Sequence, residues 1–314
     1  MASYIIGVDV GYGNTKTAHS CFSSGIKLLS SKPPISTRVI ETTSGFYTIG
    51  NGKLSIQSSK TEDENMRALT MAGIAEELKR THTTVADVYL GCGVPLTRMG
   101  AEKHAFLDYY NKNRRMVYKY EDVTYSVNLL SVDVFPQGYA GVVAKLPELR
   151  KSVVIVDIGS WTIEILPIEN YVPDLTRCKS LTMGTITCMN DINETLRQNL
   201  GKEADESTIK EIMMYGTSDI PAEYLSIIKS GLRDYVTSIM DTLRALNFNP
   251  DLTQFVFIAG GASIMKHFLP ESFKRNCVII DDVHINAKGY EDLIRKKGPL
   301  PPHWPRATIA RAWT

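Results

Sequence analysis

The chain has 314 residues, of which 43% are hydrophobic and 22% are charged, as in globular proteins with a large buried core. Lysine plus arginine (35) nearly equals aspartate plus glutamate (34), which argues against an extended nucleic-acid-binding face. No apolar run reaches the length of a membrane span, and no basic leader precedes the first apolar segment. We therefore expect a cytoplasmic protein without a membrane partner, and the length favours two domains.

The five cysteines are scattered along the sequence and show no Cys-x-x-Cys spacing. A zinc site or a disulfide framework is therefore not expected. Cys92 lies between two glycines, but no histidine or second cysteine stands beside it in the sequence, which favours a structural role over a reactive thiol.

The first predicted strand, Tyr4–Val8, ends in an aspartate that is followed by a glycine turn. Glycine has no Cβ, so a Gly-x-Gly turn lets backbone N–H groups approach an anion, and a nearby lysine adds positive charge. The aspartate can hold a metal ion through water. We predict a hairpin that binds phosphate and Mg²⁺, with Asp9 as the metal anchor. Its candidate phosphate-binding residues are Gly11, Gly13, Asn14, Thr15 and Lys16.

The rest of the first half is predicted to alternate between strands and helices. Short strands are expected in 17–60, a helix in 62–80, a strand in 85–93, a helix in 98–112 and a strand pair in 116–130.

A further strand is predicted to end near Phe135, and a helix of small residues, Gly138–Ala144, follows it. Small side chains on one face of a helix allow close approach of a second helix. Gln137 stands where the strand gives way to the helix, and ligands bind at such edges of α/β sheets. A glutamine at this position could orient a water molecule for attack on a phosphate.

The second half of the chain opens with a repeat of the first hairpin pattern. By itself the first pattern also describes an ordinary β-hairpin, and it matches neither of the two commoner nucleotide-binding signatures. When Asp157 is aligned with Asp9, however, an apolar strand, an aspartate, a glycine turn and a small polar residue recur together. Internal similarity at a fixed offset indicates a duplicated unit. The candidate phosphate-binding residues of the second hairpin are Gly159, Ser160 and Thr162.

Two later glycine positions complete the predicted nucleotide site. Gly184 precedes a long predicted helix, where a glycine can admit a ribose or phosphate, or can simply cap the helix. The buried strand Phe255–Ile258 runs into Gly260, Gly261 and Ala262. A base or ribose could approach the backbone there, and an ordinary strand-to-helix turn is the alternative.

The C-terminal segment 298–314 is rich in proline and basic residues and contains Trp304 and Trp313. We expect it to form a strap over the protein's own surface, because both tryptophans favour burial. An exposed contact element is the alternative.

Five segments, taken in their order along the chain, resemble the actin/Hsp70/sugar-kinase ATPase fold. They are a first phosphate hairpin (Asp9–Lys16), a first connecting segment (Phe135–Ala144), a second phosphate hairpin (Asp157–Thr162), an adenosine motif (Ile258–Ser263) and a second connecting segment (Asn286–Tyr290). Within that superfamily the chain looks most like the ParM/StbA family of bacterial actins, which segregate plasmids. Gln137 stands where some ParM proteins have a glutamate and where actin has a glutamine.

The resemblance implies an α/β protein of two duplicated RNase H-like domains around a central nucleotide cleft. Domain I would cover 1–150, with 283–314 packing back on it, and domain II would cover 151–282. The implied cofactors are ATP or GTP and Mg²⁺. Asp9 and Asp157 would hold the metal ion through water, and Gln137 would orient the attacking water. These three are the catalytic candidates.

The same resemblance implies partners. Subunits would associate head to tail into a filament, because a heterologous interface that does not close into a ring extends without limit. A centromere-binding adaptor protein would link the filament to plasmid DNA, which the chain would reach only indirectly.

Two other functions stay open. A small-molecule kinase of the same fold would need an acidic general base, and Gln137 is not a base. A cell-shape or scaffold homologue would bind nucleotide without turning it over; membrane-attached relatives of that kind carry amphipathic ends, whereas the C-terminal segment here is proline-rich.

Overall fold

A computed structural model describes residues 2–34, 38–50, 54 and 64–296. The chain forms two compact units: a first unit of Met1–Lys145 with His284–Thr314, and a second unit of Leu146–Val283. The chain therefore passes from one unit to the other twice. No helix in the described ranges is long and apolar enough to cross a membrane. The expected C-terminal strap lies outside the described residues.

The first unit is built on a seven-stranded sheet with the order β1-β8-β10-β9-β6-β7-β5. Strands β1, β8 and β10 run parallel, so their carboxyl ends meet at one edge of the sheet. The strands are β1 (Ala2–Gly7), β5 (Ile26–Leu29), β6 (Val39–Thr42), β7 (Gly45–Ile49), β8 (Val85–Val94), β9 (Arg115–Tyr120) and β10 (Val123–Pro136).

Strand β10 differs from the sequence-based expectation, because it joins the second strand of the predicted 116–130 pair to the strand predicted near Phe135. The result is a single strand of 14 residues with a register shift between Leu129 and Ser131. Such a bulge inserts an extra residue and bends the strand. A single long strand therefore carries the chain from the β9–β10 hairpin to Gln137.

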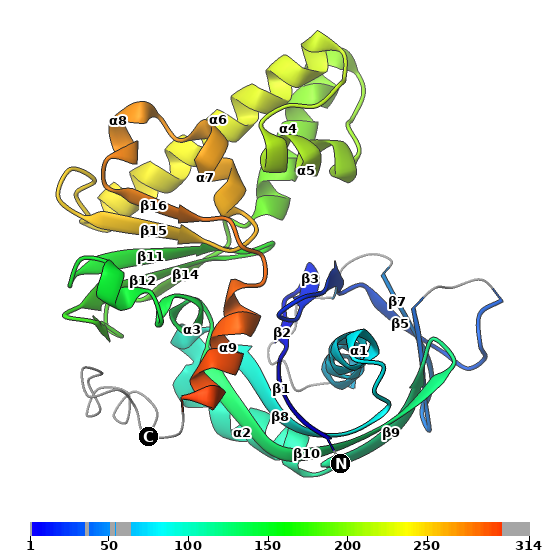
Figure 1. Cartoon of the computed structure of the whole chain (residues 1–314). Helices are drawn as coiled ribbons and strands as arrows, with labels where there is room; N and C mark the ends of the chain where they lie inside the picture. Colours follow the sequence, from blue (N-terminus) through cyan, green and yellow to red (C-terminus); the bar gives the residue numbers. More distant parts are fainter. Residues whose placement is uncertain (1, 35–37, 51–53, 55–63, 297–314) are drawn as a thin grey trace. The chain divides into compact units, whose positions relative to one another are not determined.

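Helix α1 (Asn65–Arg80) lies inside the curve of this sheet (Figure 1). The Tyr118 hydroxyl of β9 donates to the Met71 carbonyl at 2.8 Å, which ties the helix to the sheet. Helix α2 (Met99–Asn111) follows the short helix η1 (Leu96–Arg98) and joins the same core, where the Tyr110 hydroxyl is 2.7 Å from that of Thr70 in α1.

A small three-stranded sheet, β2-β3-β4, follows β1 in the chain. Its strands are β2 (Asp9–Val10), β3 (Asn14–Lys16) and β4 (Cys21–Ser23). It packs against α1 at Gly73, where an added Cβ would lie 3.0 Å from Val8 Cγ1 and 3.2 Å from Thr17 Cγ2. The glycine thus lets α1 support the segment that carries the first predicted phosphate hairpin.

Helices α3 (Tyr139–Val142) and α9 (Ile285–Arg295) pack against each other at backbone distance. A Cβ on Gly289 would lie 2.2 Å from the Ala140 carbonyl oxygen, so only glycine fits there. A Cβ on Gly7 of β1 would lie 2.1 Å from the Ala287 carbonyl oxygen. The close approach predicted for the helix of small residues is therefore present, although α3 is shorter than the predicted range 138–144.

The second unit contains a sheet with the order β13-β12-β11-β15-β16, in which β14 also pairs with β12. Strand β11 is buried along its whole length, as its continuous apolar run predicts. Helices α4 to α8 gather on one side of this sheet (Figure 1). The strands are β11 (Val153–Ile158), β12 (Ile163–Glu169), β13 (Val172–Pro173), β14 (Lys179–Leu181), β15 (Gln254–Ile258) and β16 (Cys277–Ile280). The helices are η2 (Leu146–Glu148), α4 (Thr185–Leu200), α5 (Glu206–Tyr215), α6 (Ala222–Ala245), α7 (Ala262–Phe268) and α8 (Glu271–Lys274).

The cysteines are all free, and Cys92 is buried in β8. Burial raises the pKa of the Cys188 thiol, in α4, to about 12, so it stays protonated and unreactive at neutral pH. The structural role expected for Cys92 agrees with its buried position, whereas Cys21 is exposed.

Candidate functional site

Strands β2 and β3 form the first predicted phosphate hairpin and pair antiparallel, with Asp9 opposite Lys16. One backbone bond closes the turn: the Gly11 N–H donates to the Asn14 carbonyl at 3.0 Å. A Cβ on Gly11 would lie 3.0 Å from that same carbonyl oxygen, so a residue with a side chain would require the turn to shift by a few tenths of an ångström. Gly11, one of the two glycines that the sequence indicated for this turn, thus lies in close contact with the backbone of the turn.

Two predicted residues of the turn contact the protein interior. The Thr15 side chain is fully buried, and its hydroxyl lies 2.9 Å from that of Ser24. The Gly13 carbonyl accepts the Ser24 N–H at 3.0 Å. Ser24 therefore holds the hairpin through two hydrogen bonds, and Thr15 supports the turn through its buried side chain.

Two predicted residues, Gln137 and Lys16, meet at Asp9. Gln137 Nε2 donates to Asp9 Oδ1 at 2.6 Å, and Lys16 Nζ lies 3.4 Å from Asp9 Oδ2. Asp9 is only 3% exposed, and a buried carboxylate is stable when donors of this kind satisfy it. The carboxylate is thus held in one orientation at the base of the turn.

Gln137 reaches this position from the carboxyl end of β10. Its backbone N–H donates to the Val94 carbonyl at 2.9 Å, which continues the pairing of β10 with β8. Because Nε2 is engaged by Asp9, the amide oxygen Oε1 is left as an acceptor, and no described residue donates to it. A water molecule could donate a hydrogen bond to this oxygen.

The second predicted phosphate hairpin, formed by β11 and β12, repeats the geometry of the first. The Gly159 N–H donates to the Thr162 carbonyl at 2.9 Å, and a Cβ on Gly159 would lie 3.0 Å from that oxygen. Asp157 precedes the turn and is 7% exposed. The repeat that was predicted from the sequence is therefore also a repeat of backbone structure.

The two hairpins differ in the residue opposite the aspartate. Asp157 is paired across the strands with Glu164, at the position that Lys16 occupies in the first hairpin. Glu164 is 6% exposed, and the Ser180 hydroxyl donates to its Oε1 at 2.6 Å. The second hairpin therefore carries two nearly buried carboxylates, which attract a cation more strongly than an acid–lysine pair.

Gly184 is placed where the N-terminus of α4 meets the second hairpin. Its N–H donates to the Trp161 carbonyl at 3.0 Å, and the Ile186 N–H donates to the Ser160 carbonyl at 2.9 Å. A Cβ on Gly184 would lie 2.4 Å from the Ser160 carbonyl oxygen. The hairpin thus caps the helix, and packing alone requires a glycine; a role of Gly184 in nucleotide binding stays a prediction.

The double glycine after β15 forms a tight strand-to-helix turn. Gly261 packs on β11, where an added Cβ would lie 2.2 Å from Ile158 Cγ2, and the buried Ala262 begins α7. Gly260 is exposed, and a Cβ there would meet only Val283 Cγ1 at 3.4 Å. Of the three predicted residues, Gly260 has the backbone that a ligand could approach.

Ala259, just before this double glycine, has a φ of 67°, in the left-handed region that favours glycine. A non-glycine residue there stores about 1–2 kcal/mol of strain. Strain of this kind concentrates at functional sites. Nothing in the sequence marks this alanine, because its residue type is not typical of a left-handed turn.

The donor set of the hairpins suits a magnesium ion that keeps most of its water. In the described ranges, no group of three or more histidine, cysteine, aspartate or glutamate side chains is placed to hold a metal ion. Mg²⁺ in nucleotide sites usually takes one or two carboxylates and the substrate phosphates and retains several waters. One nearly buried aspartate at the base of each turn, Asp9 and Asp157, fits this mode.

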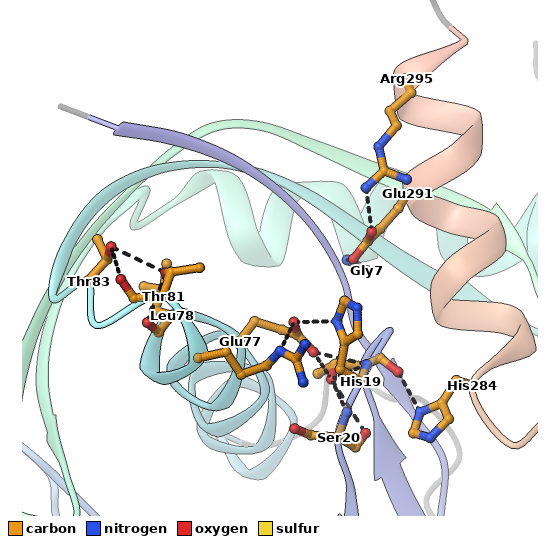
Figure 2. Close-up of polar contacts among 12 residues, drawn as sticks. Gly7, His19, Ser20, Glu77, Leu78, Thr81, Thr83, His284, Glu291 and Arg295 are labelled. Carbon is orange, nitrogen blue, oxygen red and sulfur yellow. Dashed lines mark hydrogen bonds and ion pairs between the residues drawn. The ribbon is translucent and has the colours of Figure 1, made fainter.

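A polar network that the sequence did not indicate supports the first hairpin (Figure 2). Glu77 of α1 accepts hydrogen bonds from the Thr17 hydroxyl, from the His19 N–H at 3.1 Å and from His19 Nδ1 at 2.8 Å. His284, just before α9, donates through Nδ1 to the Thr17 carbonyl at 2.8 Å. One segment after the hairpin is thereby fixed to both α1 and α9.

Glu291 of α9 makes a second connection, to the strand that leads into the hairpin. Its Oε1 accepts the Gly7 N–H at 3.2 Å, and its Oε2 lies 2.7 Å from a guanidinium nitrogen of Arg295 (Figure 2). Burial raises the pKa of the Glu291 carboxyl, and the bonds from Gly7 and Arg295 oppose that shift. The helix thus holds the end of β1 through a side chain as well as through close packing.

Comparisons with known proteins agree with this geometry. Residues 7–139 match the family model described as the actin-like proteins N-terminal domain. Residues 155–271 match the model described as the archaeal actin homologue MreB-like, C-terminal. A search of curated protein sequences found no match.

Solved structures of actin homologues have the same fold. The archaeal actin homologue Ta0583 in complex with ADP has a TM-score of 0.73 at 19% identity, covering 93% of this chain and 99% of its own. The Alp12 filament structure has a TM-score of 0.70 at 17% identity, with 95% and 99% covered. A 15-stranded ParM filament from Clostridium botulinum has a TM-score of 0.72 at 16% identity, with 94% and 100% covered.

Proposed function

Since the chain belongs to the actin-like proteins, we propose that it hydrolyses a nucleoside triphosphate and assembles into filaments. The observation that carries this proposal is the repeated hairpin. Two nearly buried aspartates each precede a glycine turn that is closed by the same backbone bond. Successive backbone N–H groups in such turns bind phosphate well.

In this proposal each hairpin binds phosphate of a nucleoside triphosphate, ATP or GTP. When bound, Mg²⁺ would neutralise charge that develops on the phosphates. Asp9 and Asp157 would hold the waters of that ion, and Lys16 would add a positive charge beside the first turn. The backbone N–H groups of the two turns would bind the phosphate oxygens.

Gln137 would orient the attacking water through Oε1, because Nε2 is already committed to Asp9. A covalent nucleophile is not needed, since phosphoryl transfer is catalysed mainly by positioning and electrostatic stabilisation. Gly260, whose backbone is exposed beside the strained Ala259, would lie against the ribose or base.

The assembly part of the proposal draws on the relatives, of which the Alp12 and Clostridium botulinum ParM structures are filaments. Head-to-tail association of identical subunits would produce such a polymer. We further propose that a centromere-binding adaptor links the filament to plasmid DNA in the cytoplasm. The nearly balanced charge of the chain supports indirect rather than direct contact with DNA.

A small-molecule kinase of the same fold finds less support at the site. Its substrate hydroxyl would need a general base, and the nearest carboxylate to Gln137 is Asp9, which already accepts from Gln137 and Lys16. Phosphate transfer to a sugar in a substrate screen would favour the kinase.

Assembly and turnover measured together test the proposal. Purified protein at micromolar concentration should form sedimentable polymer with nucleotide and Mg²⁺, visible as filaments by negative-stain microscopy, and should release phosphate. Asp157→Ala should abolish turnover, whereas Gly100→Ala, which meets nothing within 4 Å, should behave as wild type. Absence of polymer with every nucleotide would rule out the filament, and polymer without phosphate release would indicate a non-catalytic scaffold.

A further inference from the structure

Gln137 stands at the start of an unusual turn. Gly138 has φ 75° and ψ −59°, and the Tyr139 N–H donates back to the Gln137 carbonyl at 2.9 Å. A bond across two residues with these angles is the rarer, strained form of γ-turn, which a residue with a Cβ adopts only at a cost. The Gln137 backbone is therefore bonded on both sides, because its own N–H donates to Val94.

Asn286 of α9 holds this turn through the Gly138 N–H, which takes no part in the hydrogen bond that closes the turn. Its Oδ1 accepts the Gly138 N–H at 2.9 Å. Asn286 is 5% exposed, and a Cβ on Gly141 would lie 3.1 Å from the same oxygen, so α3 and α9 leave little room for a water to replace it. A buried N–H without an acceptor is costly, so the turn would change shape if Asn286 were shortened.

Tyr290, one turn further along α9, confines Gln137 from another direction. Its ring stacks on Phe135 with centroids 5.8 Å apart and an interplanar angle of 13°. A Cβ on Gly93 would lie 1.9 Å from the Tyr290 hydroxyl oxygen and 2.9 Å from Gln137 Cγ. The absence of a side chain at Gly93 thus lets these two side chains lie side by side.

We propose that Asn286 is a positioning residue for Gln137. By accepting the Gly138 N–H, it fixes the γ-turn that directs the Gln137 amide to Asp9. The effect passes through the Gly138 backbone. The inference rests on the proposed function, in which Gln137 orients the attacking water.

The kinetic test compares Asn286→Ala with Asn286→Asp, which keeps an oxygen acceptor. Asn286→Ala should lower kcat on the order of tenfold to a hundredfold, the effect of a small misplacement of a positioning group, with nucleotide affinity unchanged. Asn286→Asp should recover much of that loss. In the Gln137→Ala background, Asn286→Ala should cause no further loss, because residues that act as one unit are not additive.

A second readout needs no turnover. In protein labelled with ¹⁵N-glutamine, the Gln137 side-chain amide signal is the one missing from Gln137→Ala. Asn286→Ala should shift this signal. The matched control is Asn276→Ala, which removes a buried asparagine of the second unit that donates to the Pro250 and Asp251 carbonyls and should leave the signal in place. If the wild-type protein does not hydrolyse nucleotide, the proposed function is wrong, but the predicted shift of the Gln137 signal can still be tested.

Unchanged kcat and an unchanged Gln137 signal in Asn286→Ala would overturn the inference, as would losses that add to those of Gln137→Ala. If Asn286→Ala does not fold, Gly138→Ala disrupts the same γ-turn from within. It should give the same loss of kcat and the same shift of the signal, and the inference fails if neither changes.

Discussion

The two predicted phosphate hairpins share a backbone and differ in charge. In each, a glycine N–H donates to the carbonyl three residues later, at 3.0 Å in the first and 2.9 Å in the second. Opposite the aspartate, however, the first has Lys16 and the second has Glu164. A duplicated turn can bind phosphate in both places, while the side chains around it have diverged. The first hairpin is suited to neutralising phosphate charge through Lys16 and to orienting Gln137 through Asp9. The second is suited to attracting a cation.

The hairpins also differ in what supports them. The first is held through Ser24 of the segment after β4 and through Glu77 of α1. The second is backed directly by the N-terminus of α4, with Gly184 at the contact. Disturbing the second hairpin should therefore disturb a helix of the core as well.

The largest expected effect is on the metal requirement. Asp157→Ala should lower turnover by at least about a hundredfold, and Asp9→Ala by about tenfold, because Lys16 already compensates the charge of Asp9. Hydrolysis measured against Mg²⁺ concentration checks this order, with Asp241→Ala, which breaks only a surface ion pair, as the control. An equal or larger loss in Asp9→Ala would contradict the larger role expected for Asp157 in holding the cation.

The charges opposite the two aspartates should act with opposite sign on nucleotide binding. Lys16→Gln should weaken the affinity about tenfold, because a charge-assisted bond to phosphate is lost. Glu164→Gln should strengthen binding in the absence of Mg²⁺, because a buried negative charge beside the phosphates is removed. Titration with a fluorescent nucleotide analogue, with and without Mg²⁺, measures both affinities. If the affinity changes in the same direction in the two variants, the charges of the two hairpins do not act as described.

Because the two hairpins are supported differently, a glycine substitution in each should lower the unfolding free energy by a different amount. Gly184→Ala should cost about 1–3 kcal/mol of unfolding free energy or more, since its Cβ would meet backbone of the second hairpin at 2.4 Å. Gly11→Ala should cost about 1 kcal/mol or less, since the nearest atom lies at 3.0 Å in a turn that can open. Urea unfolding of both variants, with Gly100→Ala as the control, compares their free energies of unfolding. A larger loss of unfolding free energy in Gly11→Ala would mean that the first turn is the more rigid one.

The smallest expected effect concerns the strained residue of the second unit. Ala259→Gly should raise the unfolding free energy by about 0.5–1 kcal/mol, because glycine accepts a φ of 67° without strain. Ala105→Gly, at an exposed position inside α2, should lower it by about 1 kcal/mol. Equal losses in both variants would mean that the left-handed turn at Ala259 stores no strain.

Much of this molecule follows from local patterns. Continuous apolar runs give the buried strands β11 and β15, and the Asp-x-Gly turns give both hairpins, because strand burial and glycine turns depend on neighbouring residues. The actin-like fold could be predicted because five such segments occur in a fixed order. The length of β10 could not, since a bulge at Leu129 joins two runs that are separate in the pattern.

By itself, the sequence determined the repeat: an aspartate, a glycine turn and a polar residue in each half, with Gln137 at the end of a strand. Only the tertiary structure decided that Gln137 and Lys16 meet on Asp9, and that Asn286 holds the turn after Gln137. The contacts of Gln137 with Asp9 and of Asn286 with Gly138 join residues more than a hundred positions apart, so they depend on which strands are neighbours and on how closely α9 packs against α3. Close packing within the second unit likewise explains Gly184, which meets the backbone of Ser160, and Gly261, which meets Ile158. The sequence had left a ligand contact and a purely structural role open for both glycines.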